Sequence, residues 1–290
     1  MKKLNVNQTQ SGLQDIWYRF KKNKPALIGF IVIVIIGLIA IFANLIADYD
    51  TMAIAMYPVD RLQTPSWEHL FGTDQFGRDL FARTIHGARV SLSFGLICAG
   101  LGMIGGSVIG ASAAYFGGKV DNIIMRIVDV IMSIPGILLT LALITVLGLG
   151  LKNMIIAMTI GMIPGFSRIV RSLVITIVRA EYIEAAKASG CSNARIIFVH
   201  VLPNAVAMII VYSTMNIAGL IIGAASLSFI GMGVQPPTPE WGAMVSEATD
   251  YMRLYPHVIL VPGLSIVVTA LSFNLFGDGL ADALDPRMRD

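Results

Sequence analysis

The sequence predicts an all-α protein that crosses a membrane several times. Hydrophobic residues make up 56% of the chain and charged residues only 13%, whereas globular proteins carry roughly 25% charged residues. Three long stretches, 25–47, 90–118 and 130–151, contain no Asp, Glu, Lys, Arg or His. Each can span a hydrocarbon core, which takes a helix of about 20 residues. A soluble domain is therefore excluded, and we expect six transmembrane helices.

The expected elements follow the apolar stretches in order. Helically spaced apolar residues at 13, 16, 17 and 20 predict an amphipathic helix on the membrane surface within segment 1–24, the alternative being a disordered basic leader. The first membrane helix and an outer loop occupy 25–87. A five-helix core is expected over 88–278, with helices at about 90–116, 126–149, 154 to past Pro164, 205–230 and 257–277. A tail, 279–290, follows.

Lysine and arginine are distributed unequally between the two sides of this arrangement. Six helices place both termini on one side, together with fifteen of the 21 basic residues. The other side holds Arg61, Arg78, Arg83, Arg89, Lys152 and Arg253. Because cytoplasmic loops carry the excess of positive charge, we expect both termini and the loop 181–204 in the cytoplasm.

Residues that could supply catalysis or energy are not apparent. Asp129 is the one acid near a membrane interior, and we interpret it as a helix-end residue that can pair with Arg126. The run 117–120, GGKV, lacks the spacing of a phosphate-binding loop. The four histidines are scattered and the two cysteines lack metal-ligand spacing, so no metal site is expected. A net charge of +3 gives little support to nucleic-acid binding.

The most polar stretch between two apolar tracts is 181–204, EYIEAAKASGCSNARIIFVHVLPN. Its first half predicts a short helix with two faces. One face holds Tyr182, Ala185, Ala186 and Ser189, and the other holds Glu181, Glu184 and Lys187. Gly190 can end this helix in a left-handed conformation, Ser192 can cap a second helix, and Pro203 is expected to break or kink the chain. This is either an ordinary loop or a docking element for a partner protein.

The order of residues in this stretch resembles a known signature. Glu184-Ala185-Ala186, Gly190 and Leu202-Pro203 match the EAA signature of membrane subunits of bacterial ABC importers, with His200 at a position where the general signature is aliphatic. The resemblance implies a coupling helix that sits in a cleft of a separate ATPase subunit. The residues expected to carry this coupling are Glu181, Glu184, Ala185, Ala186, Lys187, Gly190, Leu202 and Pro203.

Three further motifs resemble the dipeptide/oligopeptide/nickel permease family, specifically its C-type (DppC/OppC-like) subunits. They are 69–79 (HLFGTDQFGRD), 226–239 (SLSFIGMGVQPPTP) with Trp241-Gly242, and 274–287 (NLFGDGLADALDPR). The resemblance covers nearly all of the chain beyond about residue 14. It implies a type I ABC importer permease fold in the bacterial plasma (inner) membrane, without enzymatic activity of its own.

The same resemblance implies a set of partners. These are a B-type permease in a heterodimer with this chain, two ATPase subunits, and an extracytoplasmic substrate-binding lipoprotein or periplasmic protein. ATP and Mg²⁺ would bind the ATPase subunits, so no cofactor is expected on this chain. The implied function is ATP-driven uptake of di- and oligopeptides, in which this chain forms half of the translocation path.

Outer-loop residues are expected to face the binding protein or the partner permease. They are Trp67, Asp74, Arg78, Asp79 and Trp241. The alternative is that Gly72, Thr73, Asp74 and Gly77 shape a rigid re-entrant turn, since these residue types favour tight loops.

Two rival functions remain open at this point. A nickel or metal-chelate importer would be the same machine with a different cargo. An ATP-independent channel or secondary carrier is disfavoured because charged residues at mid-membrane depth, which mark ion coupling, are missing from the sequence pattern.

Overall fold

The computed structural model describes residues 12–284. Residues 1–11 and 285–290, which include the outer parts of the predicted segments 1–24 and 279–290, lie outside the described residues. Five helices are long and apolar enough to cross a membrane, and a bent helix pair supplies a sixth span when it is counted as one. The five are α2 (Lys24–Ile41), α4 (Leu80–Phe116), α7 (Leu151–Val178), α10 (Leu202–Phe229) with the helical turns before it, and α12 (His257–Leu284). The predicted all-α class is confirmed, and the described residues supply five candidate spans, or six with the bent pair counted as one.

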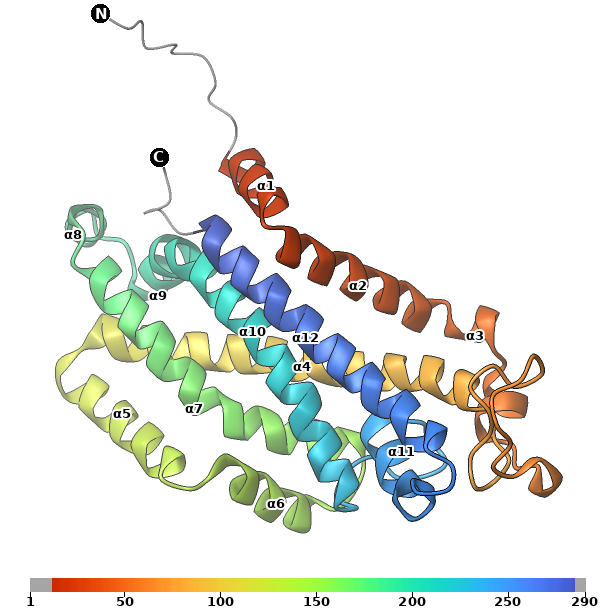
Figure 1. Cartoon of the computed structure of the whole chain (residues 1–290). Coiled ribbons are helices and arrows are strands. Elements are labelled where there is room, and N and C mark those ends of the chain that lie inside the picture. The colour runs from red at the N-terminus through yellow and green to blue at the C-terminus, as the bar shows by residue number, and fades with distance from the viewer. Residues whose placement is uncertain (1–11, 285–290) are drawn as a thin grey trace, which may run out of the picture.

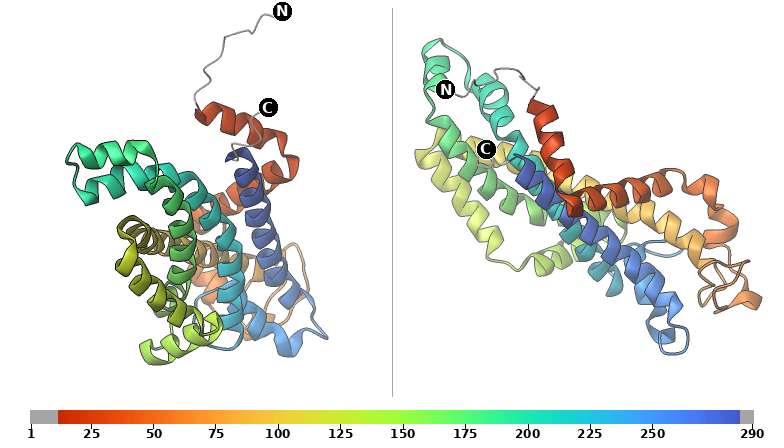
Figure 2. Two further views of the ribbon diagram at one scale, coloured as in Figure 1. Left: turned by 90° about the vertical axis from the view of Figure 1, so that its left-hand side faces the viewer. Right: turned by 45° about the horizontal axis from the view of Figure 1, so that its top comes forward.

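The long helices run between two ends of the molecule (Figure 1). One end, which we call the α8 end, gathers α1 (Gly12–Lys22), α8 (Glu181–Ala188), α9 (Asn193–Arg195) and the last turns of α12. The opposite end, the loop end, holds the short elements α3 (Ala43–Ile46), η1 (Tyr49–Ile54), η2 (Pro58–Asp60), α11 (Trp241–Ala248) and η4 (Thr249–Tyr251). Figure 2 shows α8 and α9 projecting away from the bundle.

The closest helix packing joins α4 to α7 through glycines. A Cβ on Gly106 would clash with Phe166, and one on Gly110 would lie 2.9 Å from the backbone nitrogen of Arg171. Gly102 meets Met162 on the same face. The glycines spaced four apart therefore form a small-residue stripe, which lets two membrane helices approach closely.

Helix α1 is the helix expected within segment 1–24, and its position on the membrane surface stays a prediction. Its Phe20 is buried and stacks edge-on against Phe30 of α2 and Phe276 of α12, with ring centroids 6.1 and 5.5 Å away. Asn23, the cap of α2, donates from Nδ2 to Asp282 Oδ2 at 3.2 Å. Helix α1 is thus attached to α2 and α12.

The second membrane helix begins ten residues earlier than predicted. α4 starts at Leu80, where Asp79 Oδ1 accepts a hydrogen bond from the Ala82 N–H at 2.8 Å. The prediction began the helix only after its basic residues. In the structure the side chains of these residues are paired with nearby groups. His86 Nε2 lies 2.9 Å from the Ala47 carbonyl oxygen, and Arg89 Nε donates to Ala40 O at 2.9 Å.

The predicted single helix 126–149 is wrong. The chain forms α5 (Gly118–Met132) and α6 (Gly136–Leu147), which meet at an angle of 85°. The break lies at Ser133, Ile134 and Pro135. Pro135 has no N–H to donate and disfavours helical backbone at the residue before it. α5 also includes residues 118–122, where a link was expected.

Pro203 does not break the chain as predicted. The backbone stays helical from α9 through a π-helical turn, η3 (Ile196–Val201), into α10. Pro203 stands in the first turn of α10, a position that tolerates a residue without an N–H. The local widening of the helix just before it replaces the expected break.

Candidate functional site

α8 is an exposed helix held by a small number of contacts. The side chains of Glu181, Glu184, Ala185 and Lys187 are exposed, whereas Ile183 is fully buried. Ala186 is half-buried and packs against the same cluster as Ile183. The helix therefore presents charged and small side chains outward while one aliphatic side chain fixes it to the bundle.

The anchor of α8 reaches three other helices. Ile183 belongs to a buried cluster with Val174 of α7, Ile196 of η3 and Ala111 of α4. Burying one such side chain contributes about 1.5–3 kcal/mol. A movement of α8 would therefore be transmitted to α4 and α7 through packed side chains.

A second attachment joins the loop to the end of α4. The Tyr115 hydroxyl donates to Asn193 Oδ1 at 2.8 Å. The ammonium group of Lys187 lies 5.1 Å from the Tyr115 ring centroid, within the range of a cation–π contact. Neither Ile183 nor Tyr115 was selected from the sequence, although Ile183 is the one aliphatic residue between Glu181 and Ala188 other than the alanines.

The corner between α8 and α9 has the predicted geometry. Gly190 adopts φ +79°, the left-handed region that glycine enters without steric cost. The Cys191 N–H donates to Ala186 O at 3.1 Å, which satisfies a free carbonyl at the helix end. Ser192 Oγ accepts from the Arg195 N–H at 3.3 Å and caps α9.

The structure divides the eight predicted coupling residues into two groups. Six lie on α8 or at its end. Leu202 and Pro203 instead begin α10, beyond the π-helical turn. Leu202 is half-buried and packs against the cluster that holds Ile183, whereas Pro203 is exposed. The role of these eight residues in coupling stays a prediction.

Two ion pairs tie α5 to α7 in the half of the bundle nearer α8. Arg171 donates two parallel hydrogen bonds of 2.6 Å to Asp121, from Nε to Oδ1 and from Nη2 to Oδ2. Arg168 Nη2 lies 2.6 Å from Asp129 Oδ1. Asp129 is thus paired with Arg168 of another helix and not with Arg126 as the sequence suggested. This difference follows from the break after α5, which lays that helix along α7.

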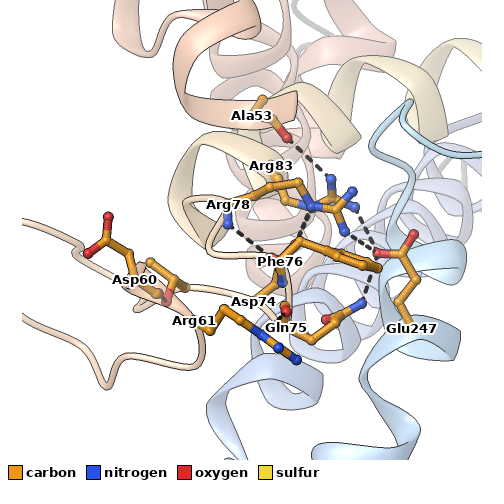
Figure 3. Close-up of polar contacts among 10 residues, drawn as sticks. Ala53, Asp60, Arg61, Asp74, Gln75, Phe76, Arg78, Arg83 and Glu247 are labelled. Atoms are coloured by element: carbon orange, nitrogen blue, oxygen red, sulfur yellow. Dashed lines mark hydrogen bonds and ion pairs between the residues drawn. The ribbon is translucent and has the colours of Figure 1, made fainter. Parts of the chain in front are cut away.

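The loop end contains a buried charge cluster formed by Asp74, Arg78, Arg83 and Glu247 (Figure 3). Asp74 Oδ2 lies 2.6 Å from Arg78 Nε and 3.4 Å from Arg83 Nε. Glu247 Oε2 accepts from Arg78 Nη2 at 2.6 Å and from Arg83 Nη2 at 3.2 Å. Both arginine side chains are 1% exposed. Two cations and two anions balance, and they join the outer loop and α4 to α11.

A tight turn presents Asp74 to this cluster. Gly72 and Gly77 have φ values of +79° and +77°. Asp74 Oδ1 accepts from the backbone N–H groups of Phe76 and Arg78 at 2.8 and 3.0 Å. The turn-forming alternative therefore describes Gly72, Asp74 and Gly77 correctly.

Four of the five residues predicted to face a partner are buried inside the chain. Asp74 and Arg78 belong to the buried charge cluster. Asp79 caps α4 and lies 2.9 Å from His69 Nδ1. Trp241 is 2% exposed and donates from Nε1 to Thr84 O at 3.0 Å. These four residues are buried because their polar groups pair with other groups of the same chain. Direct partner contact is kept as a prediction for Trp67 alone, which is 97% exposed.

The start of the outer loop is capped by Asp48. The Thr51 hydroxyl and the Thr51 backbone N–H both donate to Asp48 Oδ1 at 2.7 Å. These hydrogen bonds stabilise the carboxylate and lower the pKa of Asp48. The charged form therefore holds the first turn of η1.

Within residues 12–284, no group of three or more His, Cys, Asp or Glu side chains is placed to hold a metal ion.

Comparison with known families identifies the class of protein. Residues 106–290 match the family model described as "binding-protein-dependent transport system inner membrane component". Residues 11–65 match the "N-terminal TM domain of oligopeptide transport permease C". Together the two matches cover both ends of the chain.

Curated relatives agree with these matches over nearly the full length. The chain is 45% identical to the dipeptide transport system permease protein DppC of Alkalihalophilus pseudofirmus, over 95% of this chain and 90% of the relative. It is 43% identical to the glutathione transport system permease protein GsiD of Escherichia coli, over 98% of this chain and 93% of the relative.

A solved structure shows the same fold at low sequence identity. The inward-facing MetNI methionine ABC transporter has a chain that matches with TM-scores of 0.57 and 0.58 in two crystal forms, at 20% identity. The match covers 70% and 71% of this chain and 97% and 98% of that one. Fold, family models and relatives agree, and the chain belongs to the inner-membrane permease subunits of binding-protein-dependent ABC importers, in the branch of the peptide and glutathione permeases.

Proposed function

We propose that this chain is one of two permease subunits of an ATP-driven importer of di- or oligopeptides, and that α8 couples it to the ATPase. Two partner classes follow from the family: ATPase subunits and an extracytoplasmic substrate-binding protein. The finer composition we propose is a B-type permease paired with this chain, two ATPase subunits, and a binding lipoprotein or periplasmic protein. ATP and Mg²⁺ bind the ATPases in this proposal.

The observation that carries the coupling proposal is the combination of exposure and anchoring in α8. Its outer side chains are accessible, and the small Ala185 permits close approach of a partner surface. Ile183 and Tyr115 attach the same helix to α4, α7 and η3. A partner that moves α8 therefore moves the bundle, in the manner of a rigid-body transition between two packed states.

The orientation of the chain is part of the proposal. Most of the lysine and arginine residues among residues 12–284 lie toward the α8 end, and by the positive-inside rule this supports a cytoplasmic location for that end. α1 and the end of α12 lie at the same end as α8 (Figure 1), which supports cytoplasmic termini. The loop end then faces the binding protein.

The cargo proposal rests on the relatives. One is named for dipeptide and another for glutathione transport, and glutathione is itself a small peptide. The nickel or metal-chelate alternative has no comparable support among these relatives. Uptake of a labelled dipeptide into membrane vesicles, driven by ATP and inhibited by vanadate, would support the peptide assignment. Uptake of nickel without dipeptide uptake would overturn it.

Coupling can be tested with two variants of the α8 corner. Glu184→Lys reverses a charge on the exposed face, and Gly190→Asp adds an acidic side chain at the left-handed corner, where φ is +79°. We expect both to insert in the membrane, to lower transport and to uncouple it from ATP hydrolysis. Lys119→Glu, an exposed charge reversal outside α8, is the matched control. Normal transport with normal ATPase stimulation in both variants would contradict the coupling role.

A further inference from the structure

The break between α5 and α6 exposes irregular backbone in the middle of a membrane span. Ser133, Ile134, Pro135 and Gly136 are all exposed. The break lies halfway along the α5–α6 pair, as Pro164 lies halfway along α7. Irregular backbone at this depth does not occur against lipid, and it is tolerated only where it is buried in protein or lines a water-filled cavity. This side of the chain therefore does not face the bilayer.

Two adjoining cavities follow the break. One, of about 260 Å³, is lined by α5–α6, the middle of α7 and α10, and includes Tyr212 and Asn216. The other, also about 260 Å³, is lined by α6, α7 and α10 and includes Thr140 and Ser226. They share Gly136, Gly161 and Met162. We call the combined hollow the groove. The helices α5 and α6, which line it, lie on the side of the molecule opposite α2 (Figure 1).

The groove contains polar atoms with unused hydrogen-bonding capacity. Asn216 donates from Nδ2 to Tyr212 O at 2.7 Å. The Oδ1 atom of Asn216 and the hydroxyl of Tyr212 have no protein partner among the described residues. Both side chains are half-buried, and the Tyr212 ring is held edge-on against Phe166 with centroids 4.9 Å apart. Two polar groups held in place thus stand near the middle of α10.

We propose that the groove lines the path of the cargo, and that Tyr212 and Asn216 hydrogen-bond the backbone of a peptide in transit. The occupant is argued from chemistry: each peptide unit carries an N–H and a C=O that need partners, whereas a lipid chain would leave both polar groups unpaired. Gly165 leaves room beside the groove, since a Cβ at this position would meet nothing within 4 Å. The proposal rests on the proposed peptide import for the identity of the occupant.

Access of water to the groove is tested first by cysteine labelling in the assembled importer. In a background carrying Cys98→Ala and Cys191→Ser, Asn216→Cys and Tyr212→Cys are treated with a charged, membrane-impermeant methanethiosulfonate. The matched control is Ile35→Cys on α2, which is half-exposed near mid-span on the opposite side. We expect labelling at position 216 at least tenfold faster than at position 35. Equal or slower labelling would overturn the proposal.

Contact with the cargo is tested by transport. One hydrogen bond to the peptide contributes roughly 1 kcal/mol, so losing it should lower the transport rate about fivefold. We expect Asn216→Leu to lower kcat/KM for dipeptide uptake about fivefold, with ATPase stimulation retained, and Asn216→Gln to restore most of it. Uptake by Asn216→Leu equal to the unsubstituted importer would overturn the assignment of the residue. Absence of dipeptide uptake by the unsubstituted importer would instead overturn the proposed function, while the labelling result would still report on the groove.

Discussion

Removing Glu247 should destabilise the loop end more than any ordinary surface substitution. Glu247→Ala takes away the oxygen that pairs with Arg78 at 2.6 Å and with Arg83 at 3.2 Å. Asp74 alone would then face two guanidinium groups that are 1% exposed. Breaking a buried ion pair on one side costs about 3–5 kcal/mol. Because the Glu247 side chain keeps 19% exposure, we expect a cost near the lower limit, about 3 kcal/mol.

Thermal unfolding of the purified importer in detergent measures this cost. A loss of about 3 kcal/mol corresponds to a fall in Tm of roughly 6–12 °C for a chain of this size class. Glu247→Gln keeps the shape of the side chain and removes its charge, so it should fall between Glu247→Ala and the unsubstituted protein. Glu68→Ala, an exposed acid of the outer loop, is the control. A Tm for Glu247→Ala equal to that of Glu68→Ala would refute the reasoning.

Three other substitutions test the packing and the exposed surfaces. Gly110→Ala forces a methyl group against the α7 backbone and should lower the free energy of unfolding by about 1–3 kcal/mol. In the control Gly100→Ala, the methyl group meets nothing within 4 Å, so this variant should be neutral or stabilising. Equal unfolding temperatures of the two variants would contradict the packing argument. Ile183→Ala should release α8, which would be seen as faster hydrogen exchange over 181–188 while exchange in α10 stays unchanged. Unchanged exchange in α8 would contradict the anchoring role of Ile183. Trp67→Ala should change the unfolding free energy by less than about 0.5 kcal/mol and should weaken association with the binding protein. Normal association with the binding protein would count against partner contact at Trp67.

The sequence predicted the spans well because apolar length is a local property. The prediction failed at α4. The stretch without charged residues put the start of this helix near residue 90, whereas the helix starts at Leu80 with Asp79 as its cap. Buried pairing made the difference: Arg83 donates to Ala53 O at 3.2 Å and to Glu247, so its charge does not mark a helix end. Partners 30 and 164 residues away cannot be read from local composition.

The candidate site shows the same division between local and distant information. The conformation of Gly190 and the cap at Ser192 were predictable because a turn depends on its own residues. The burial of Asp74 and Trp241 was not, since it depends on α11 folding back onto the outer loop. Likewise the pairing of Asp129 with Arg168 depends on the bend at Pro135, a residue inside the range 126–149 that was predicted as a single helix.

Site-directed cross-linking of α8 to the ATPase tests the central claim most directly. Ala185→Cys, in the background lacking Cys98 and Cys191, would be combined with single cysteines on the ATPase surface in the assembled importer. Trp67→Cys, at the opposite end of the molecule, serves as the control. The coupling account predicts a disulfide between position 185 and the ATPase whose yield changes when ATP binds, and none from position 67. Failure of position 185 to cross-link at any ATPase cysteine, in an importer that still transports, would contradict it.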